Sequence, residues 1–192
     1  GVDKTLLPLG GKPLLAHILD ALDVRPAAIS ANGDAARFAC FGLPVLPDGA
    51  FVDQGPLAGV LAGLDWAAAL GMESLLTVPG DTPLIPRGLA AALWPAPAHA
   101  VSLGRGHYLV ALWPVACRDA LRALLSRPGR RGVAWFSLDI GMREVTFPAG
   151  AWDPFQNINT QTDLARLRGW WTGNGEAGGA VGSRPPVQTA GP

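Results

Sequence analysis

A single carboxylate, Asp81, closes an apolar run in the stretch LLTVPGDTPLIP, residues 75–86. A buried charge is costly unless it is paired or binds a cation, so we expect Asp81 either to begin a turn or to bind a ligand. Three more polar residues, Ser30, Asn32 and Asp48, also stand at the ends of short apolar runs. Four such side chains, at the ends of three predicted strands, favour one shared ligand site.

Other residues could bind an anion or a flat ring. Lys4 is either an ordinary surface charge or a mobile cation for a phosphate. Asn157 and Asn159 lie two residues apart in FQNINTQTDL, so an extended backbone would aim both amides the same way. Each amide offers donors and an acceptor to a heterocycle, although asparagine is also a common turn residue. The cluster RPGRRG, residues 127–132, is either a solvated loop or a binding site for an anion.

The elements that must position these residues alternate between strands and helices. Helical spacing predicts helices over residues 13–22, 56–70, 87–94 and 115–126, and a capping box predicts one more from residue 160. Apolar or alternating runs predict strands over residues 26–32, 44–48, 73–81, 99–104, 107–114 and 143–147, with a turn at Arg105-Gly106. This alternation predicts an α/β fold with an open, mainly parallel sheet, in which ligands bind beyond the carboxyl ends of the strands.

Gly55-Pro56 is predicted to begin the second of these helices. Backbone N–H groups at such a start can face an anion or the edge of a base, although plain helix initiation also explains the pair.

Composition narrows the class of protein. The 192 residues are 49% hydrophobic, and Lys+Arg and Asp+Glu both number 15, which gives a formal net charge of zero. This balance argues against a nucleic-acid surface. The sequence has no run of 18 apolar residues and no signal peptide, so neither a membrane partner nor export is expected, and we predict a cytoplasmic domain.

Two further features concern cysteines and the end of the chain. Cys40 and Cys117 form no CxxC or Cys/His pattern, so we expect both to be reduced, buried and inert. From Gly169 onward the sequence is rich in glycine and proline, and residues 169–192 are predicted to be a disordered tail. Trp170 and Trp171 could still pack on the domain that precedes it.

Eight stretches, taken in order, resemble the molybdenum cofactor guanylyltransferases. They are GVDKTLLPLGGKPLLAH, ISAN, PVLPD, GPLAGVLAGL, VPGDTPLIP, HYLVALW, RRGVAWF and FQNINTQTDLARL. The resemblance runs through residues 1–168, which it implies to be a nucleotidyltransferase domain: Rossmann-like, with helices on both faces of the sheet, of the nucleotide-diphospho-sugar transferase type. It implies transfer of GMP from Mg-GTP to molybdenum-molybdopterin, which forms the guanine dinucleotide cofactor and releases pyrophosphate.

The resemblance also implies roles for individual residues. Catalysis would fall to Lys4, which meets the nucleotide phosphates, and to Asp81, the Mg²⁺ ligand. The residues that it assigns to GTP are Lys4, Ser30, Asn32, Asp48 and Asp81. Those that it assigns to the pterin are Asn157, Asn159 and Arg131. Molybdenum-insertion proteins and apo-molybdoenzymes are the implied protein partners.

Family members begin with a strand and a glycine-rich loop, LAGGxSxRMGG, that wraps the triphosphate. The present sequence starts at the last glycine of that pattern, so the first strand and the loop are expected to be missing. Two other hypotheses stay open on the sequence. One is a sibling enzyme, either a cytidylyltransferase for the same pterin or a sugar-phosphate nucleotidylyltransferase. The other is a non-catalytic protein that binds the pterin and hands the cofactor on.

Overall fold

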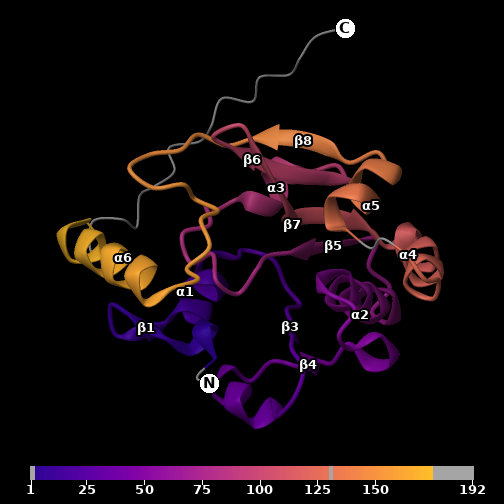
Figure 1. Cartoon of the computed structure of the whole chain (residues 1–192), viewed down its shortest axis with the longest axis horizontal. Coiled ribbons are helices and arrows are strands. Elements are labelled where there is room, and N and C mark those ends of the chain that lie inside the picture. Colours follow the sequence, from indigo (N-terminus) through magenta and orange to yellow (C-terminus); the bar gives the residue numbers. More distant parts are fainter. Residues whose placement is uncertain (1–2, 130–131, 175–192) are drawn as a thin grey trace, which may run out of the picture.

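The computed structural model describes residues 3–129 and 132–174, which fold into three sheets and the helices around them (Figure 1). A small antiparallel hairpin joins β1 (Pro8–Leu9) to β2 (Lys12–Pro13), and a parallel pair joins β3 (Ile29–Ser30) to β4 (Val45–Leu46). The main sheet has the order β5-β7-β6-β8. Its strands are β5 (Ser74–Thr77), β6 (Ala98–Ser102), β7 (Arg105–Pro114) and β8 (Arg143–Thr146).

The main sheet is mixed, and the prediction of a mainly parallel sheet is wrong for the described residues. β7 runs antiparallel to both β5 and β6, and only β6 and β8 are parallel. The cause is a hairpin in which Ser102 pairs with Arg105, because a two-residue connection can join only antiparallel strands. Its turn is Leu103-Gly104, with φ of 50° and 70°, two residues before the predicted position.

All the predicted helices are present. The α-helices are α1 (Leu14–Ala21), α2 (Pro56–Ala69), α3 (Leu89–Leu93), α4 (Arg118–Leu125), α5 (Val133–Asp139) and α6 (Gln161–Asn174). Short 3-10 helices are η1 (Lys4–Leu6), η2 (Ala35–Phe41), η3 (Gly49–Phe51) and η4 (Val115–Cys117). Of these elements, α5 and the 3-10 helices lack the long apolar periodicity that would have predicted them.

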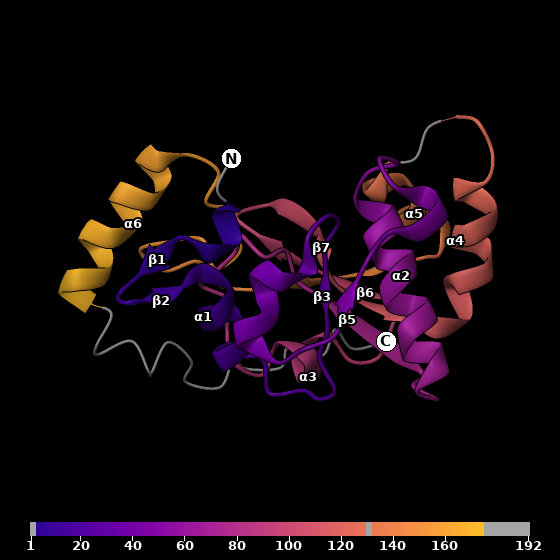
Figure 2. The ribbon, with the colours of Figure 1, turned by 90° about the horizontal axis from the view of Figure 1, so that it is seen from below.

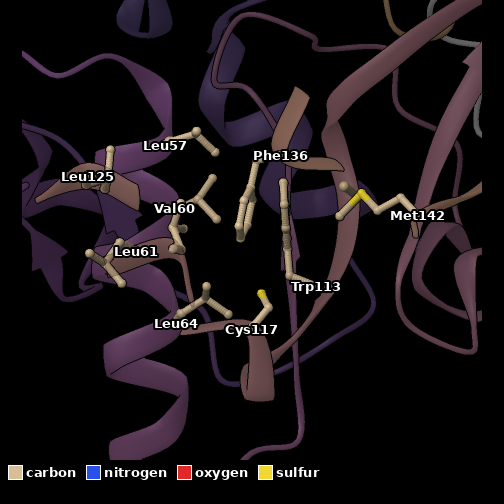
Figure 3. Packing of buried hydrophobic residues seen from close by; sticks show 11 residues of the cluster. Leu57, Val60, Leu61, Leu64, Trp113, Cys117, Leu125, Phe136 and Met142 are labelled. Carbon is tan, nitrogen blue, oxygen red and sulfur yellow. The ribbon is translucent and has the colours of Figure 1, made fainter. Parts of the chain in front are cut away.

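The helices cover both faces of the main sheet, as the sequence predicts (Figure 2). On one face, α2, α4 and α5 pack a core around Trp113 and Phe136, whose rings stack 6.2 Å apart (Figure 3). On the other face, α1 and α3 pack against Val110 and Leu112. Successive residues of β7 point to opposite faces, so this one strand contributes to both cores.

Helix α6 packs against the β1–β2 hairpin (Figure 1). Its start is the predicted capping box, in which the Thr160 N–H donates to Asp163 and the Asp163 N–H donates to the Thr160 hydroxyl. The helix continues through Gly169 to Asn174, so it extends past residue 169, where the tail was predicted to begin. The Trp171 ring of this helix packs against the backbone of Gly10 in the hairpin. Packing of this half-buried tryptophan against the hairpin explains why the helix extends into a glycine-rich stretch. Residues 175–192 lie outside the described part of the chain.

The two cysteines differ, and the prediction that both are buried is wrong for Cys40. Cys40 is exposed on η2, whereas Cys117 is buried. Burial raises the pKa of the Cys117 thiol to about 11, so this residue is unreactive near neutral pH. Among the described residues, no helix combines the length and the apolar character needed to cross a membrane.

Candidate functional site

A crevice of about 730 Å³ separates β3 from β5. Its walls include residues 29–32 after α1 and residues 74–80 along β5, and the N-terminus of α2 at Gly55-Pro56 also lines it. In the part of the chain that the structure describes, no hydrogen-bonded ladder joins β3 to β5. The crevice therefore runs between the edges of β3 and β5, and its part around Asn32 and Asp48 lies beyond the carboxyl ends of β3 and β4, where ligands bind in open α/β sheets.

One end of the crevice holds Ser30, Asn32 and Asp48, but Asp81, the fourth residue that the sequence places at the same site, does not line the crevice. The Asn32 amide donates to the Asp48 carboxylate over 2.7 Å, and its oxygen accepts from the Asp48 backbone N–H over 2.9 Å. Gly59 of α2 lies against Ser30: a Cβ on this glycine would be 2.6 Å from the Ser30 hydroxyl oxygen. The glycine lets the helix approach these polar side chains.

Arg37 ties this end of the crevice to the start of the chain. Its guanidinium donates to Asp3 over 3.0 Å and to the Asn32 carbonyl over 2.8 Å. Asp3 also accepts from the backbone and hydroxyl of Thr5, which fixes the first turn of η1. Burial acts to raise the pKa of Asp3, but the bonds from Thr5 and Arg37 outweigh it and lower that pKa below its usual range.

Helix η1 in turn lies against the loop that carries Asp81. A Cβ on Gly80 would stand 2.7 Å from the Thr5 methyl group, so only glycine lets these two segments approach so closely. Lys4 is exposed on η1 beside this contact. Lys4 and Asp81 do not themselves line the crevice, but their neighbours Thr5 and Gly80 do.

Asp81 lies in a turn that ends the strand earlier than predicted. Pro79 has no N–H to continue the ladder, and the Thr82 hydroxyl donates to the Pro79 carbonyl over 2.8 Å. The Asp81 side chain accepts a 3.0 Å hydrogen bond from the Asn157 amide, which is 76 residues away in the sequence. The Ile158 N–H also donates to the Asp81 carbonyl over 2.8 Å. Asp81 is thus both a turn residue and one member of a tertiary pair.

The structure brings the predicted site residues together in two groups. Ser30, Asn32 and Asp48 meet in the crevice, whereas Asp81 meets Asn157 outside its lining, next to Gly80. Asn159 is exposed like Asn157, with Ile158 buried between them, as the predicted alternation requires. Arg131 lies outside the described residues.

Sequence reasoning missed the residues that connect these groups. Asp3 precedes Lys4 and Thr5 as an N-cap, a pattern that could have been noticed. Arg37 sits in GDAARF, where no spacing or motif marks it. A cation in a short polar loop has many possible partners, and only the fold selects Asp3 and Asn32.

The fold and the site together define a class of protein. The family model of the MobA-like NTP transferase domain matches residues 1–138. The crystal structure of molybdopterin-guanine dinucleotide biosynthesis protein A from Archaeoglobus fulgidus has a TM-score of 0.65 at 19% identity, over 90% of this chain and 92% of that chain. For 2-C-methyl-D-erythritol 4-phosphate cytidylyltransferase from Thermus thermophilus the TM-score is 0.59 at 18% identity, over 88% of this chain and 94% of that chain. The chain is a nucleotidyltransferase.

A sequence comparison sets the family within that class. The molybdenum cofactor guanylyltransferase of Acidiphilium cryptum (strain JF-5) is 57% identical over 166 residues, which cover 85% of this chain and 84% of the relative. The chain belongs to the molybdenum cofactor guanylyltransferase family. Its activity is accordingly the guanylyl transfer that forms the guanine dinucleotide cofactor, and the cytidylyl and sugar-phosphate alternatives are disfavoured.

Proposed function

We propose that the crevice binds GTP with its guanosine end at Asn32 and Asp48 and its phosphates beside Lys4 and Asp81. GMP would pass there to molybdenum-molybdopterin. The observation that most directly supports this arrangement is the position of the Asp81 loop. It lies between η1, which carries Lys4, and the segment that carries Asn157.

The guanosine end is polar and already ordered. Asn32 and Asp48 hold one another, yet the amide keeps a second N–H and a second lone pair for a ligand. A carboxylate and an amide side by side can accept from and donate to the edge of a purine or to ribose hydroxyls. Because the pair is formed before GTP arrives, binding would not have to order these two side chains.

Asp81 fits the role of a magnesium ligand. The described residues hold no group of three His, Cys, Asp or Glu side chains that could enclose a metal ion. Mg²⁺ commonly takes only one or two carboxylates and completes its shell with water and substrate phosphates. The Asn157 amide holds Oδ1 of Asp81, and no hydrogen bond to Oδ2 forms within the described chain. When bound, Mg²⁺ would neutralise charge on the phosphates.

The chain positions the reactants and does not attack them. An oxygen of the phosphate monoester on the pterin forms a bond to the α-phosphorus of GTP. The bond from that phosphorus to the oxygen bridging to the β-phosphate breaks, and pyrophosphate leaves. Lys4 would place a point charge against the phosphates, and Asp81 would hold the cation. Catalysis would then come mainly from positioning and charge neutralisation.

We place the pterin phosphate next to Asp81, on the side of Asn157 and Asn159. The contact between Asn157 and Asp81 supports this placement, because it joins the acceptor side to the phosphate side. The roles of Arg131, of the partner proteins and of the cytoplasm as the location stay predictions. Residues 1–168 are the proposed catalytic domain.

Substitution of Asp81 tests the proposed function. Asp81→Asn keeps the acceptor oxygen for Asn157 but removes the charge, so GMP transfer should fall by about 100-fold or more while the melting temperature changes little. Asp119→Asn, which alters an exposed carboxylate on α4, is the control and should leave transfer unchanged. Near-normal magnesium-dependent transfer by Asp81→Asn would overturn the assignment. No transfer by the unaltered chain would instead favour the non-catalytic pterin-binding hypothesis.

A further inference from the structure

The segment that presents Asn157 to Asp81 is anchored at its start by a buried carboxylate. Asp153, whose side chain is 9% exposed, accepts a 2.6 Å hydrogen bond from the Ser102 hydroxyl of β6. The same oxygen accepts from the backbone N–H of Phe155 over 2.9 Å. These two bonds fix both the place of Asp153 on the sheet and the path of the chain that follows it.

A histidine completes this anchor. The Ser102 oxygen lies 2.7 Å from Nε2 of His107, and Nε2 lies 3.7 Å from the Asp153 carboxylate. A hydroxyl that donates its only proton to Asp153 must accept from His107, so Nε2 of the ring carries a proton here. The residue types match those of a hydrolase triad, but Ser102 is 0% exposed and cannot reach a substrate. The three residues therefore form a structural network.

Packed side chains between Asp153 and the Asp81 loop fix the position of Asn157. Phe155 is 0% exposed and meets the rings of His107 and Phe147 at 5.1 Å each. Ile158 is 2% exposed and its N–H donates to the Asp81 carbonyl. A short segment that is buried at both ends has little freedom to shift. The Asn157 amide between these two contacts is thereby aimed at Asp81.

We infer that Asp153 is a positioning residue for the metal site. Held by Ser102, it keeps the Asn157 amide on Oδ1 of Asp81, which would leave Oδ2 to hold a cation. The inference rests on the proposed function of Asp81. Residues that orient a metal-binding side chain commonly change metal affinity by about 10- to 100-fold when they are replaced.

The test compares the Mn²⁺ affinity of three variants and one control in the presence of GTP. Electron paramagnetic resonance of the free ion measures that affinity. Asp153→Ala should weaken Mn²⁺ binding by about tenfold, whereas Asp153→Asn, which keeps the acceptor oxygen, should stay within about twofold. Ser102→Ala should weaken binding in the same direction as Asp153→Ala. Ser137→Ala is the matched control, because Ser137 is also 0% exposed and hydrogen-bonded, but to Val133 within α5.

A double substitution separates positioning from general loss of stability. In an Asn157→Ala background, Asp153→Ala should cause no further loss of Mn²⁺ affinity, because the group that it positions is already gone. Losses that multiply would overturn the inference, and so would equal effects of Ser102→Ala and Ser137→Ala. That serine comparison also decides the matter if Asp153→Ala does not fold. The Asp81→Asn variant separates failure of the proposed function from failure of this inference. Unchanged Mn²⁺ binding in that variant contradicts the proposed role of Asp81 itself, not only the role of Asp153.

Discussion

Asn32 and Asp48 are joined by two hydrogen bonds, one between their side chains at 2.7 Å and one from the Asp48 backbone to the Asn32 amide at 2.9 Å. The first residue follows β3 and the second follows β4, so the pair closes the end of the small parallel sheet. Arg37 adds a third link through the Asn32 carbonyl. The end of the crevice assigned to guanosine is therefore built by contacts between loops and not by one element.

Replacing Asn32 should weaken GTP binding more than it slows catalysis. Asn32→Ala removes both bonds to Asp48 and leaves the carboxylate without its partner. A hydrogen bond to a charged group contributes about 1.5–3 kcal/mol, so the KM for GTP should rise by roughly tenfold or more with a smaller change in kcat. Steady-state kinetics with GTP as the varied substrate measures both. A drop in kcat at constant KM would show that this pair acts in the chemical step.

A methyl group on Gly59 should disturb the same end of the crevice. Gly59→Ala would place a Cβ 2.6 Å from the Ser30 hydroxyl oxygen and 3.5 Å from Asp48, so the KM for GTP should rise by roughly tenfold. Gly63→Ala on the same helix is the control, because its Cβ would meet the flexible end of Leu75 instead. Gly63 and Leu75 also line the crevice, so this variant should raise the KM less than Gly59→Ala does while it lowers the melting temperature. Equal KM values in the two variants would contradict this role of Gly59.

Substitution of Asn157 and substitution of Asn159, the two asparagines of the NINT stretch, should have different effects on ligand binding. Asn157 contacts Asp81, whereas the backbone N–H of Asn159 donates to Asp163 at the start of α6 and its side chain stays exposed. We therefore expect Asn157→Ala to weaken both pterin binding and Mg-GTP binding, and Asn159→Ala to weaken pterin binding alone. Isothermal titration with each ligand tests this. Loss of GTP affinity in Asn159→Ala would place that residue on the nucleotide side.

The alternation of elements was predictable because it depends on local periodicity. The helices α1 and α2 and the strands β3 and β4 appear where apolar spacing places them. The predicted turn between residues 99–104 and 107–114 implies one antiparallel pair, but its position is two residues off, because Leu103 adopts a positive φ that its residue type does not suggest. The pairing of β7 with β5 and of β6 with β8 was not predictable in the same way, because it joins segments that are far apart in the sequence.

Positions of the site residues were predictable, but their contacts were not. A polar residue at the end of an apolar run marks Asp48 or Asp81 in the sequence alone. The pairing of Asp81 with Asn157 spans 76 residues and depends on how the segment before α6 returns to β6 and to the Asp81 loop. No local pattern encodes such a contact, because it is fixed by burial of Phe155 and Ile158.

Acidification should destabilise the fold through His99. This residue is 2% exposed, and neither ring nitrogen has a hydrogen-bond partner among the described residues. Burial lowers the pKa of His99 from 6.5, although Glu144 opposes the shift. Burial also lowers the pKa of His107, with Asp153 opposing. The unfolded chain then binds more protons below about pH 6.5, so the free energy of unfolding is highest above that pH and falls as pH falls through it.

Thermal melts between about pH 7.5 and pH 5.5 measure this loss, which should be about 1.4 kcal/mol for each unit by which folding lowers the pKa. His99→Gln cannot take up the proton, so its melting temperature should depend less on pH over this range. An identical pH dependence in the variant and the unaltered chain would show that His99 is not responsible. Asp3, whose pKa is lowered, titrates below this window and does not interfere.

A chain that carries a strand and a glycine-rich loop of the type LAGGxSxRMGG ahead of residue 1 should bind GTP more tightly, and melt at a higher temperature, than residues 1–192 by themselves. β3 and β5 both line the crevice and no ladder joins them within the described chain, so each offers backbone groups that a strand between them could pair with. The loop would add a run of N–H donors for the phosphates, which Lys4 cannot replace. Thermal melts with and without Mg-GTP on both chains measure the gain, because a tenfold tighter complex adds about 1.4 kcal/mol when GTP is in excess. Equal stabilisation by GTP in the two chains would show that the loop is dispensable and that residues 1–168 bind the nucleotide without it.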